Sequence, residues 1–391
     1  MRIAVVGGRL QGLEAAYLAR KAGWEVVLID KRQNSPAQGL CSRFFCLDAG
    51  NRAELKKVIR NVDLLIPALE NREVLANLQE AAREIEIPCA FDLRAYDISS
   101  SKIVSDRLFE AMSIPAPRPW PKCGFPLVVK PPAASGSEGV IKIDSPAAWA
   151  AFEKDHGGQW IVQEYLAGPS YSIEVICAGE CCYPLQVTGL EMDDLHDCKR
   201  VFAPADLALS QQQQFAETAV AIARRLNLTG IMDVEVILHQ NQLKVLEIDA
   251  RLPSQTPTVV YQSLGINMLE LLAGCFLGGL PADILPRHEQ KAVIFEHVVV
   301  TPGCIAVSGE HAVAEAGPLV YRENFFGADE ALTNYASGRN NWIATLITTA
   351  SSRLEVLTKR NAIIERIQKE LHTPVYRDPV PVVSGKSREG Q

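Results

Sequence analysis

The sequence predicts two fold classes in succession: an α/β domain with a parallel sheet, then an α+β part with antiparallel strands. Three observations lead to this prediction. Apolar runs alternate with helical stretches through residues 1–95, and a proline-rich connection follows at residues 115–126. Beyond it, four apolar runs surround one long helix expected over Ser210–Leu226. Because 391 residues exceed one typical domain, we expect several folding units.

The first domain is expected over residues 1–95. Residues 2–6 form an unbroken apolar strand, a glycine turn occupies residues 7–12, and helical spacing over Leu13–Lys21 leads to a strand at Glu25–Asp30. The alternation continues with a strand at Phe44–Leu47, a helix at Ala53–Arg60, a strand at Val62–Ile66, a helix at Glu73–Glu84 and a short strand at Cys89–Phe91. Such alternation predicts a parallel sheet.

A small α+β lid module is expected over residues 96–180, a larger antiparallel domain over 181–378, and a flexible tail over 379–391. Serines at 99–101 can cap a helix over Lys102–Met112, which must end before Pro115. The later strands are expected at Leu127–Lys130, Tyr171–Cys177, Tyr183–Val187, Met232–Leu238 and Gln242–Ile248, with a helix at Pro146–Lys154.

Composition excludes several function classes. The 39 basic and 46 acidic residues give a net charge of −7 without a basic run, so we expect no nucleic acid partner. The first apolar run is too short for a signal or membrane segment, which indicates a cytoplasmic protein. The ten cysteines have no CxxC zinc spacing, so we expect them to be mostly small buried hydrophobes.

The glycine turn leaves an alternative open. Gly7, Gly8 and Gly12 lie between a strand and a helix, and Asp30 ends the next strand, as in dinucleotide-binding proteins. The spacing departs from G-x-G-x-x-G because the middle glycine is displaced. The sequence therefore favours a nucleotide-free sheet domain over an NAD(P)-dependent oxidoreductase. The turn could still offer helix N–H groups to a substrate carboxylate, which makes Gln11 a candidate substrate residue.

The strongest chemical pattern is acidic. Glu235, Glu247 and Asp249 alternate with apolar neighbours on two expected strands, so they should share one face. Three crowded carboxylates need a cation, and Mg²⁺ prefers a few carboxylates plus phosphate oxygens. Arg251 follows on the same face and can form two hydrogen bonds to a phosphate or a developing anion. A salt-bridged solvent face is the structural alternative.

Two lysines, a loop and a bend form the second pattern. Lys130 ends an apolar strand and Lys102 begins a helix, and both positions favour a nearby anion such as polyphosphate. The intervening Gly/Ser loop contains Ser135, Ser137, Glu138 and Gly139, whose backbone and hydroxyl groups could cover phosphates. Farther along, Gln163, Glu164, Tyr165 and Leu166 precede a glycine bend and could hold an adenine.

In this order the motifs resemble the ATP-grasp superfamily, over roughly residues 100–256. The resemblance implies an ATP-grasp fold preceded by a Rossmann-like parallel-sheet domain, with ATP and two Mg²⁺ ions as cofactors. It implies that Lys102 and Lys130 hold phosphates, that Gln163, Glu164 and Leu166 face adenine, and that Glu235, Glu247 and Asp249 bind metal. Asp249 stands where many relatives have Asn. Ser170 stands where many have a ribose-binding Glu, so Glu174 is the substitute candidate.

Three further stretches, at residues 7–12, 193–201 and 248–257, resemble a ligase family of pyrrolysine biosynthesis. That resemblance implies ligation of (3R)-3-methyl-D-ornithine to the ε-amine of L-lysine through an acyl phosphate, with ADP and phosphate released. Arg251 and Lys130 are then the expected catalytic residues, and Gln11, Glu70, Arg251 and Ser254 the expected substrate residues. Another ATP-grasp ligase or a carboxylase is the alternative.

The expected partners are small-molecule amino-acid substrates. We expect no membrane and no nucleic acid partner. The apolar segment Met268–Leu277 fits either a homodimer interface or a buried helix, and residues 286–375 contain no recognisable chemistry.

Overall fold

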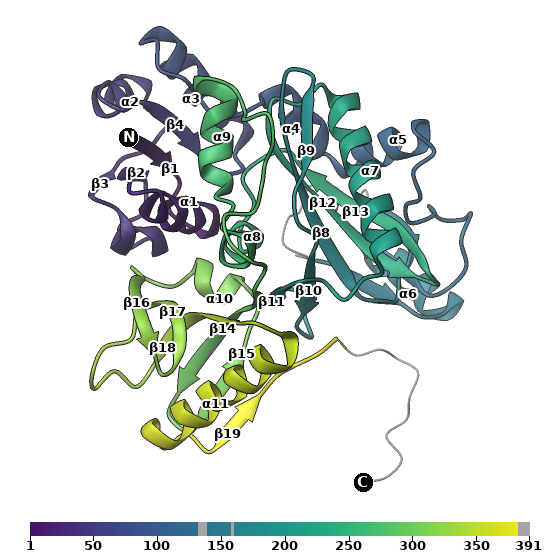
Figure 1. Ribbon diagram of the computed structural model, residues 1–391. Coiled ribbons are helices and arrows are strands. Elements are labelled where there is room, and N and C mark those ends of the chain that lie inside the picture. The colour runs from purple at the N-terminus through teal and green to yellow at the C-terminus, as the bar shows by residue number, and fades with distance from the viewer. Residues whose placement is uncertain (132–138, 158–159, 382–391) are drawn as a thin grey trace.

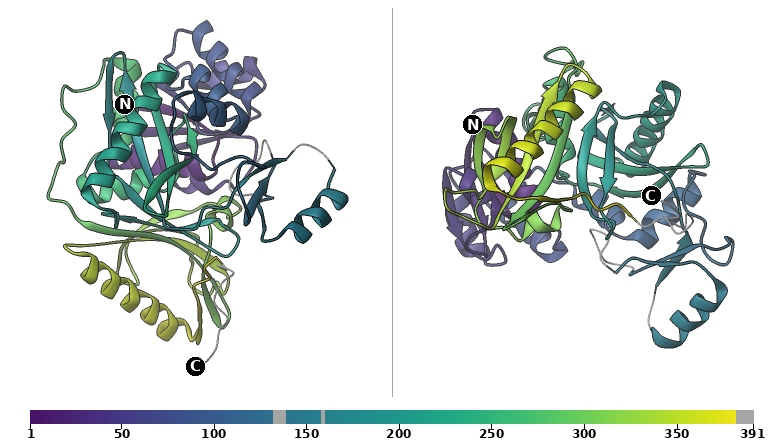
Figure 2. Two further views of the ribbon diagram at one scale, coloured as in Figure 1. Left: turned by 90° about the vertical axis from the view of Figure 1, so that its right-hand side faces the viewer. Right: turned by 90° about the horizontal axis from the view of Figure 1, so that it is seen from below.

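The computed structural model describes residues 1–131, 139–157 and 160–381 and confirms the predicted fold class. Figure 1 shows an N-terminal unit in purple, a central and C-terminal part from teal to yellow, and a small unit that carries α6 (Pro146–Asp155). Figure 2 shows the small unit projecting from the rest of the molecule. The chain thus divides into a parallel sheet, a small antiparallel sheet and a large antiparallel sheet.

The N-terminal sheet is parallel and has the strand order β3-β2-β1-β4. Its strands are β1 (Arg2–Val6), β2 (Glu25–Asp30), β3 (Arg43–Cys46) and β4 (Leu64–Pro67). Its helices are α1 (Leu10–Lys21), η1 (Pro36–Leu40), α2 (Arg52–Ile59), α3 (Arg72–Glu84) and α4 (Leu93–Ser99). The strand predicted at Cys89–Phe91 is a single bridge to Leu65, because the chain turns at once into α4, whose N-terminus Asp92 caps.

The glycine turn between β1 and α1 is closed by close packing. Gly7 has φ +104°, and a Cβ there would lie 2.2 Å from the Ala68 carbonyl oxygen. A Cβ at Gly12 would lie 1.9 Å from the Gly7 oxygen, so both positions require glycine for packing alone. Asp30, the acidic residue expected to bind ribose in a dinucleotide site, instead accepts a hydrogen bond from the Gly8 N–H at 2.6 Å.

The small sheet has the order β6-β5-β7 and is antiparallel, with β5 (Leu127–Lys130), β6 (Ile141–Ile143) and β7 (Ile161–Glu164). Its apolar side, including Leu127 and Val129, packs with Phe152 of α6. The helix α5 (Lys102–Ala111) precedes it. The next strand, β8 (Ser170–Ala178), lies within the 96–180 range expected for this module but pairs in the large sheet.

The large sheet runs β13-β12-β8-β10-β11-β14-β18-β17-β16, with β9, β15 and β19 attached beside it. Its other strands are β9 (Cys181–Pro184), β10 (Thr188–Met192), β11 (Cys198–Ala203), β12 (Gly230–His239), β13 (Gln242–Asp249), β14 (Ala292–Thr301), β15 (Cys304–Val307), β16 (Val320–Phe325), β17 (Ala328–Thr333), β18 (Trp342–Ala350) and β19 (Val375–Arg377). The remaining helices are α7 (Leu209–Leu226), α8 (Thr256–Leu264), α9 (Met268–Leu277), α10 (His311–Ala314) and α11 (Arg353–Leu371).

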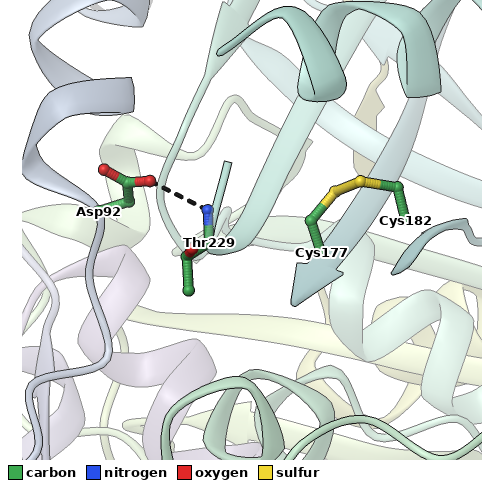
Figure 3. Close-up of a disulfide and its surroundings, with 4 residues drawn as sticks. All are labelled: Asp92, Cys177, Cys182 and Thr229. Carbon is green, nitrogen blue, oxygen red and sulfur yellow. Dashed lines mark hydrogen bonds between the residues drawn. A yellow bond between two sulfur atoms is a disulfide. The ribbon is translucent and has the colours of Figure 1, made fainter. Parts of the chain in front are cut away.

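Figure 3 shows two contacts of the large sheet, one between two of its strands and one with the N-terminal helices. Cys177 and Cys182 face each other across β8 and β9 and form a disulfide, whereas the sequence favoured mostly unpaired buried cysteines. Asp92, the cap of α4, also accepts a hydrogen bond from the Thr229 N–H at 3.0 Å, next to the start of β12. The first link staples a hairpin, and the second holds the N-terminal helices against the large sheet.

One hydrophobic cluster joins the N-terminal unit to the large-sheet part of the chain, whereas the small sheet has a cluster of its own. Buried residues of α1, such as Leu18, pack in the same cluster as Met268 and Leu272 of α9 and Phe295 of β14. The apolar character of Met268–Leu277 is therefore accounted for by burial inside the chain. Among the described residues no single helix is long and apolar enough to cross a membrane, and α8 and α9 meet that test only as a pair bent by 102°.

Candidate active site

A cavity of about 790 Å³ lies where the three units meet. The N-terminal unit contributes Glu70, the small unit contributes Lys130 and the segment 163–168, and the large sheet contributes the β12–β13 hairpin. Most of the residues predicted from the sequence as a site lie on its wall. The site is therefore a seam between folding units, as ligand sites often are.

The carboxylates that are predicted to bind metal form a cross-strand ladder. Antiparallel pairing places Glu235 opposite Glu247 and Asp233 opposite Asp249, which confirms that Glu235, Glu247 and Asp249 share one face. Asp233 is a fourth carboxylate that the sequence analysis did not single out. Burial, together with the neighbouring carboxylates of Glu247 and Glu310, raises the pKa of Glu235 to about 8. The ladder thus has more negative charge than its surroundings balance.

The ladder fits a cation bound jointly by protein and phosphate. Within residues 1–131, 139–157 and 160–381, no three His, Cys, Asp or Glu side chains are close enough to hold a metal ion by themselves. Mg²⁺ needs only one or two carboxylates when phosphate oxygens and water complete its shell. Buried Asp249 Oδ1 has no hydrogen-bond partner, and burial raises the pKa of Asp249 to about 6 although Arg251 opposes the rise. The donor set therefore suits Mg²⁺ between Glu235, Glu247 and Asp249.

Both predicted phosphate lysines lie opposite this ladder. Lys130 ends β5 with only 6% of its surface exposed, and Lys102 Nζ lies 3.8 Å from Glu247 Oε2. Burial lowers the pKa of Lys130, while Glu247 works in the opposite direction. Lys130 is thus a deeply buried cation with two carboxylates, Glu247 and Asp106, and a second cation, Lys102, near it. The two lysines together are well placed for an additional anion.

Arg251 connects the ladder to the N-terminal unit. Its Nε lies 2.7 Å from Asp249 Oδ2, and its Nη2 lies 2.9 Å from Glu70 Oε1. Gln11 Nε2 donates to the same Glu70 oxygen at 3.1 Å. Burial opposes the charge of Arg251, but Asp249 and Glu70 raise its pKa above the ordinary value. The structure thus brings three of the four predicted substrate residues into one chain of contacts.

The predicted adenine segment lies on the cavity wall, but Glu164 is engaged elsewhere. Its carboxylate accepts from Arg118 Nη2 at 3.0 Å and from Lys244 Nζ at 2.6 Å, and its N–H donates to the Arg118 carbonyl. Burial would raise the pKa of Glu164, yet these hydrogen bonds lower it to about 2. The Glu164 N–H is therefore not available to read a base, and a contact of its other backbone group with adenine stays a prediction.

The neighbours of Glu164 remain in place for a base. Leu166 is 7% exposed and Gln163 is 4% exposed, and both line the cavity. Tyr165 also lines it, with Lys142 Nζ 4.5 Å from its ring centre. The predicted loop residues Ser135, Ser137 and Glu138 lie outside the described residues. Gly139, which is described, has φ +72° and packs against Pro131.

Glu174 does not lie at the cavity wall, which makes the prediction of a ribose contact there wrong. The register places it opposite Asp233, at the inner end of the ladder, with no surface exposed. Burial raises its pKa to about 7, although a hydrogen bond with Thr256 lowers it. The start of α8 therefore covers the side chain that the sequence offered to ribose.

Glu310 is a site residue within residues 286–375, where the sequence analysis found no chemistry. Its Oε2 accepts from Ser254 Oγ at 2.8 Å and from Gln255 Nε2 at 2.7 Å, and its side chain lines the cavity. The predicted substrate residue Ser254 thus lies next to a carboxylate from residues 286–375, a segment in which the sequence predicts no site residue. Burial raises the pKa of Glu310.

Two aspartates of the 193–198 turn hold the Glu310 loop. Asp193 Oδ2 accepts from the Gly309 N–H at 3.1 Å, and Asp197 Oδ2 accepts from the His311 N–H at 3.0 Å. Both neighbours of Glu310 are therefore fixed through their backbone. The only sequence signal for this arrangement is the resemblance of residues 193–201 to a ligase family. That resemblance does not predict the contacts of the two aspartates.

A buried glutamate of α1 fixes the other side of this corner. Glu14 accepts from the Gln255 N–H at 3.2 Å and from both the N–H and the hydroxyl of Thr258 at 2.6 Å. It therefore serves as a cap for α8 that comes from another unit of the chain. Burial raises the pKa of Glu14 to about 7, although these hydrogen bonds oppose the rise.

The fold and the site define a class, the ATP-grasp ligases. A family model described as an ATP-grasp domain matches residues 99–255. A solved structure of the biotin carboxylase domain dimer of Hydrogenobacter thermophilus 2-oxoglutarate carboxylase, with MgADP, ADP and bicarbonate, has the same fold. It aligns with a TM-score of 0.69 and 13% identity over 93% of this chain and 89% of that chain.

Comparison with relatives is more specific. The 3-methyl-D-ornithine–L-lysine ligase of Methanosarcina acetivorans is 36% identical over 315 residues, which cover 80% of this chain and 84% of that protein. The ligase of the same name from Methanosarcina barkeri is 37% identical over 298 residues, 76% of this chain and 79% of that protein. This chain belongs to the 3-methyl-D-ornithine–L-lysine ligase family, and it is an ATP-grasp carboxylate–amine ligase.

Proposed function

We propose that this enzyme joins the carboxylate of (3R)-3-methyl-D-ornithine to the ε-amine of L-lysine, with ATP cleaved to ADP and phosphate. The observation that carries the proposal is the convergence of Lys102 and Lys130 on the carboxylate ladder, with Arg251 beside it, in one cavity. The family relatives supply the substrates by their names.

The first step is phosphoryl transfer. A carboxylate oxygen of the ornithine derivative attacks the γ-phosphorus of ATP, the bond to the β-phosphate oxygen breaks, and an acyl phosphate and ADP result. Lys102 and Lys130 balance the charge of the phosphates from one side of the cavity. Glu235, Glu247 and Asp249 would hold Mg²⁺, for which we propose two ions. The bound metal would supply positive charge against the charge that develops on the phosphates.

The second step forms the amide. The uncharged ε-amine of lysine attacks the acyl carbon, the carbon–oxygen bond to phosphate breaks, and the nitrogen loses a proton. Arg251 donates hydrogen bonds to the oxygen that becomes negative in this step, for which its planar fork is suited. Its contacts with Asp249 and Glu70 hold the guanidinium in position before the substrate arrives.

Recognition of two amino acids needs groups of both signs. Ammonium groups suit the carboxylates of Glu70 and Glu310, which lie on opposite units around the cavity. Gln11 and Ser254 each contact one of them and orient its carboxylate. We assign these four residues to substrate binding on that basis.

The test is release of ADP from purified enzyme with Mg·ATP, L-lysine and either D-ornithine or its 3-methyl form. We expect ADP, phosphate and one amide product in equal amounts, and no turnover without the carboxylate substrate. Formation of AMP, or ADP release that depends on bicarbonate instead of the amino acids, would contradict the proposal. A Mg²⁺ titration measures whether one ion or two are needed. A homodimer stays a prediction, which light scattering can measure.

A further inference from the structure

The C-terminal segment returns to the active site after β19. Val380 and Pro381 line the cavity, although the sequence assigns them to a flexible tail from residue 379 onward. Figure 2 shows the yellow segment that follows β19 leaving the C-terminal strands and running toward the teal strands of the large sheet. We call residues Asp378–Pro381 the C-terminal strap.

The strap is fastened by a buried ion-pair cluster. Lys199, whose side chain is 1% exposed, donates from Nζ to Asp378 Oδ1 at 2.6 Å and also to the Pro379 carbonyl oxygen. Arg200 Nη2 donates to Asp378 Oδ2 at 2.7 Å, and the Tyr376 hydroxyl donates to the same oxygen at 3.2 Å. Burial would raise the pKa of Asp378, yet Lys199 and Arg200 lower it to about 2.

The cluster is itself anchored in the large sheet. Arg200 also donates to Glu296 of β14 at 2.9 Å and contacts Glu191 of β10. Arg360 of α11 donates to the same Glu296 at 2.7 Å. The fastening of the strap thus depends on side chains from β11, from its two neighbouring strands β10 and β14, and from helix α11. Such a network is costly to disrupt.

The sheet register places the strap near the base-binding end of the cavity. β8 begins at Ser170, two residues after the bend at Gly168, and Ser170 pairs with Leu190 of β10. Met192 of β10 pairs in turn with Cys198, next to Lys199. Leu190 also pairs with Val201 of β11, so Val201 lies two strands, about 10 Å, from the start of β8, and Lys199 lies two residues farther along β11. The phosphate-facing carboxylates lie on β12 and β13, on the other side of β8.

We propose that the C-terminal strap forms the wall that covers the adenosine part of ATP, with Val380 and Pro381 in contact with the nucleoside and Asp378 holding the strap in place. This inference rests on the proposed use of ATP. Val380 is an apolar side chain with 65% of its surface exposed at the cavity wall, where a planar base would cover it. The strap would thus strengthen nucleotide binding without contacting the reacting atoms.

The test is calorimetric titration with Mg·ADP and, separately, with magnesium tripolyphosphate, which carries phosphates but no nucleoside. We expect Val380→Gly and a chain that ends at Arg377 to bind ADP about fivefold more weakly, as expected for loss of part of an apolar contact. Tripolyphosphate affinity should change by less than twofold. A chain that ends at Pro381 is the matched control and should bind both ligands as the full chain does.

Asp378→Asn keeps the shape of the anchor but weakens its ion pairs, and should lower ADP affinity without changing tripolyphosphate affinity. This variant and Val380→Gly decide the matter if the shorter chain does not fold. ADP affinity within twofold of the full chain in both point variants would overturn the role of the strap and leave the ligase function intact. A full chain that binds no ADP at all would overturn the proposed function and this inference together.

Discussion

Replacement of Arg251 by alanine tests the chemistry of the second step. Arg251 contacts Asp249 and Glu70 at 2.7 and 2.9 Å and lies two residues beyond the last residue of β13. Loss of one oxyanion donor typically lowers kcat by about 10²- to 10³-fold, or roughly 3 to 4 kcal/mol of transition-state stabilisation. Arg251→Lys keeps the charge but not the planar fork, so it should fall between wild type and alanine.

The fold should tolerate this change. The side chains of Asp249 and Glu70 are 25% and 39% exposed, so water can solvate them once the guanidinium is gone. The assay is amide formation at saturating ATP and amino acids, with a thermal melt for each variant. Arg287→Ala, which breaks an exposed ion pair with Glu270, is the matched control and should retain full activity. Amide formation by Arg251→Ala within tenfold of wild type would refute the assignment.

Three further predictions concern carboxylates. Glu247→Gln should lower kcat at least about 100-fold and raise the Mg²⁺ concentration that the enzyme requires. Its melting temperature should not change, because the Glu247 side chain is 45% exposed. Near-normal turnover at low Mg²⁺ would contradict its role as a ligand. Glu310→Ala should raise KM for an amino acid about tenfold and leave ADP affinity unchanged. A change in ADP affinity alone would contradict the assignment of Glu310 to amino-acid binding. The pKa of Glu14 is about 7 in the folded protein and 4.5 in its ordinary, unfolded surroundings. The protonated side chain therefore stabilises the folded state by about 3 kcal/mol below pH 4.5, and this contribution is lost as the pH rises through 7. Urea unfolding of unliganded Glu14→Gln should therefore depend less on pH between 5 and 8, and an unchanged slope would exclude Glu14 as the cause.

The sequence predicted those parts of the site that depend on local periodicity. Glu235, Glu247 and Asp249 are two residues apart or lie on consecutive strands of a hairpin, so strand alternation alone places them on one face. Lys130 could be found in the same way, because a charge at the end of an apolar strand is unusual. The parallel N-terminal sheet likewise follows from alternation of strands and helices.

Residues that depend on long-range packing could not be found. Glu14 lies in the stretch 11–19 of α1, in which every residue is buried. It meets its partners only after α8 docks, 241 residues or more along the chain. Glu310 follows a loop whose position is set by Asp193 and Asp197. Glu174 failed for the opposite reason, since its spacing suggested the site face but could not reveal that α8 covers it. Local pattern carries no information about which distant segment covers a side chain.

The corner at Gln255 links the N-terminal unit to the far side of the cavity. Gln255 has φ +70°, a conformation that costs a non-glycine residue about 1 kcal/mol and persists only where its surroundings impose it. Glu14 of α1 supplies that constraint, because it accepts the N–H groups of both Gln255 and Thr258. The Gln255 side chain then donates to Glu310, so the N-terminal unit orients a carboxylate on the far side of the cavity. Since Gln11 of the same helix donates to Glu70, α1 positions both carboxylates that we assign to ammonium recognition. Loss of the Gln11 and Glu14 side chains would therefore leave the lysines and the ladder that face the phosphates in place, but would disturb the alignment of the groups that we assign to amino-acid recognition.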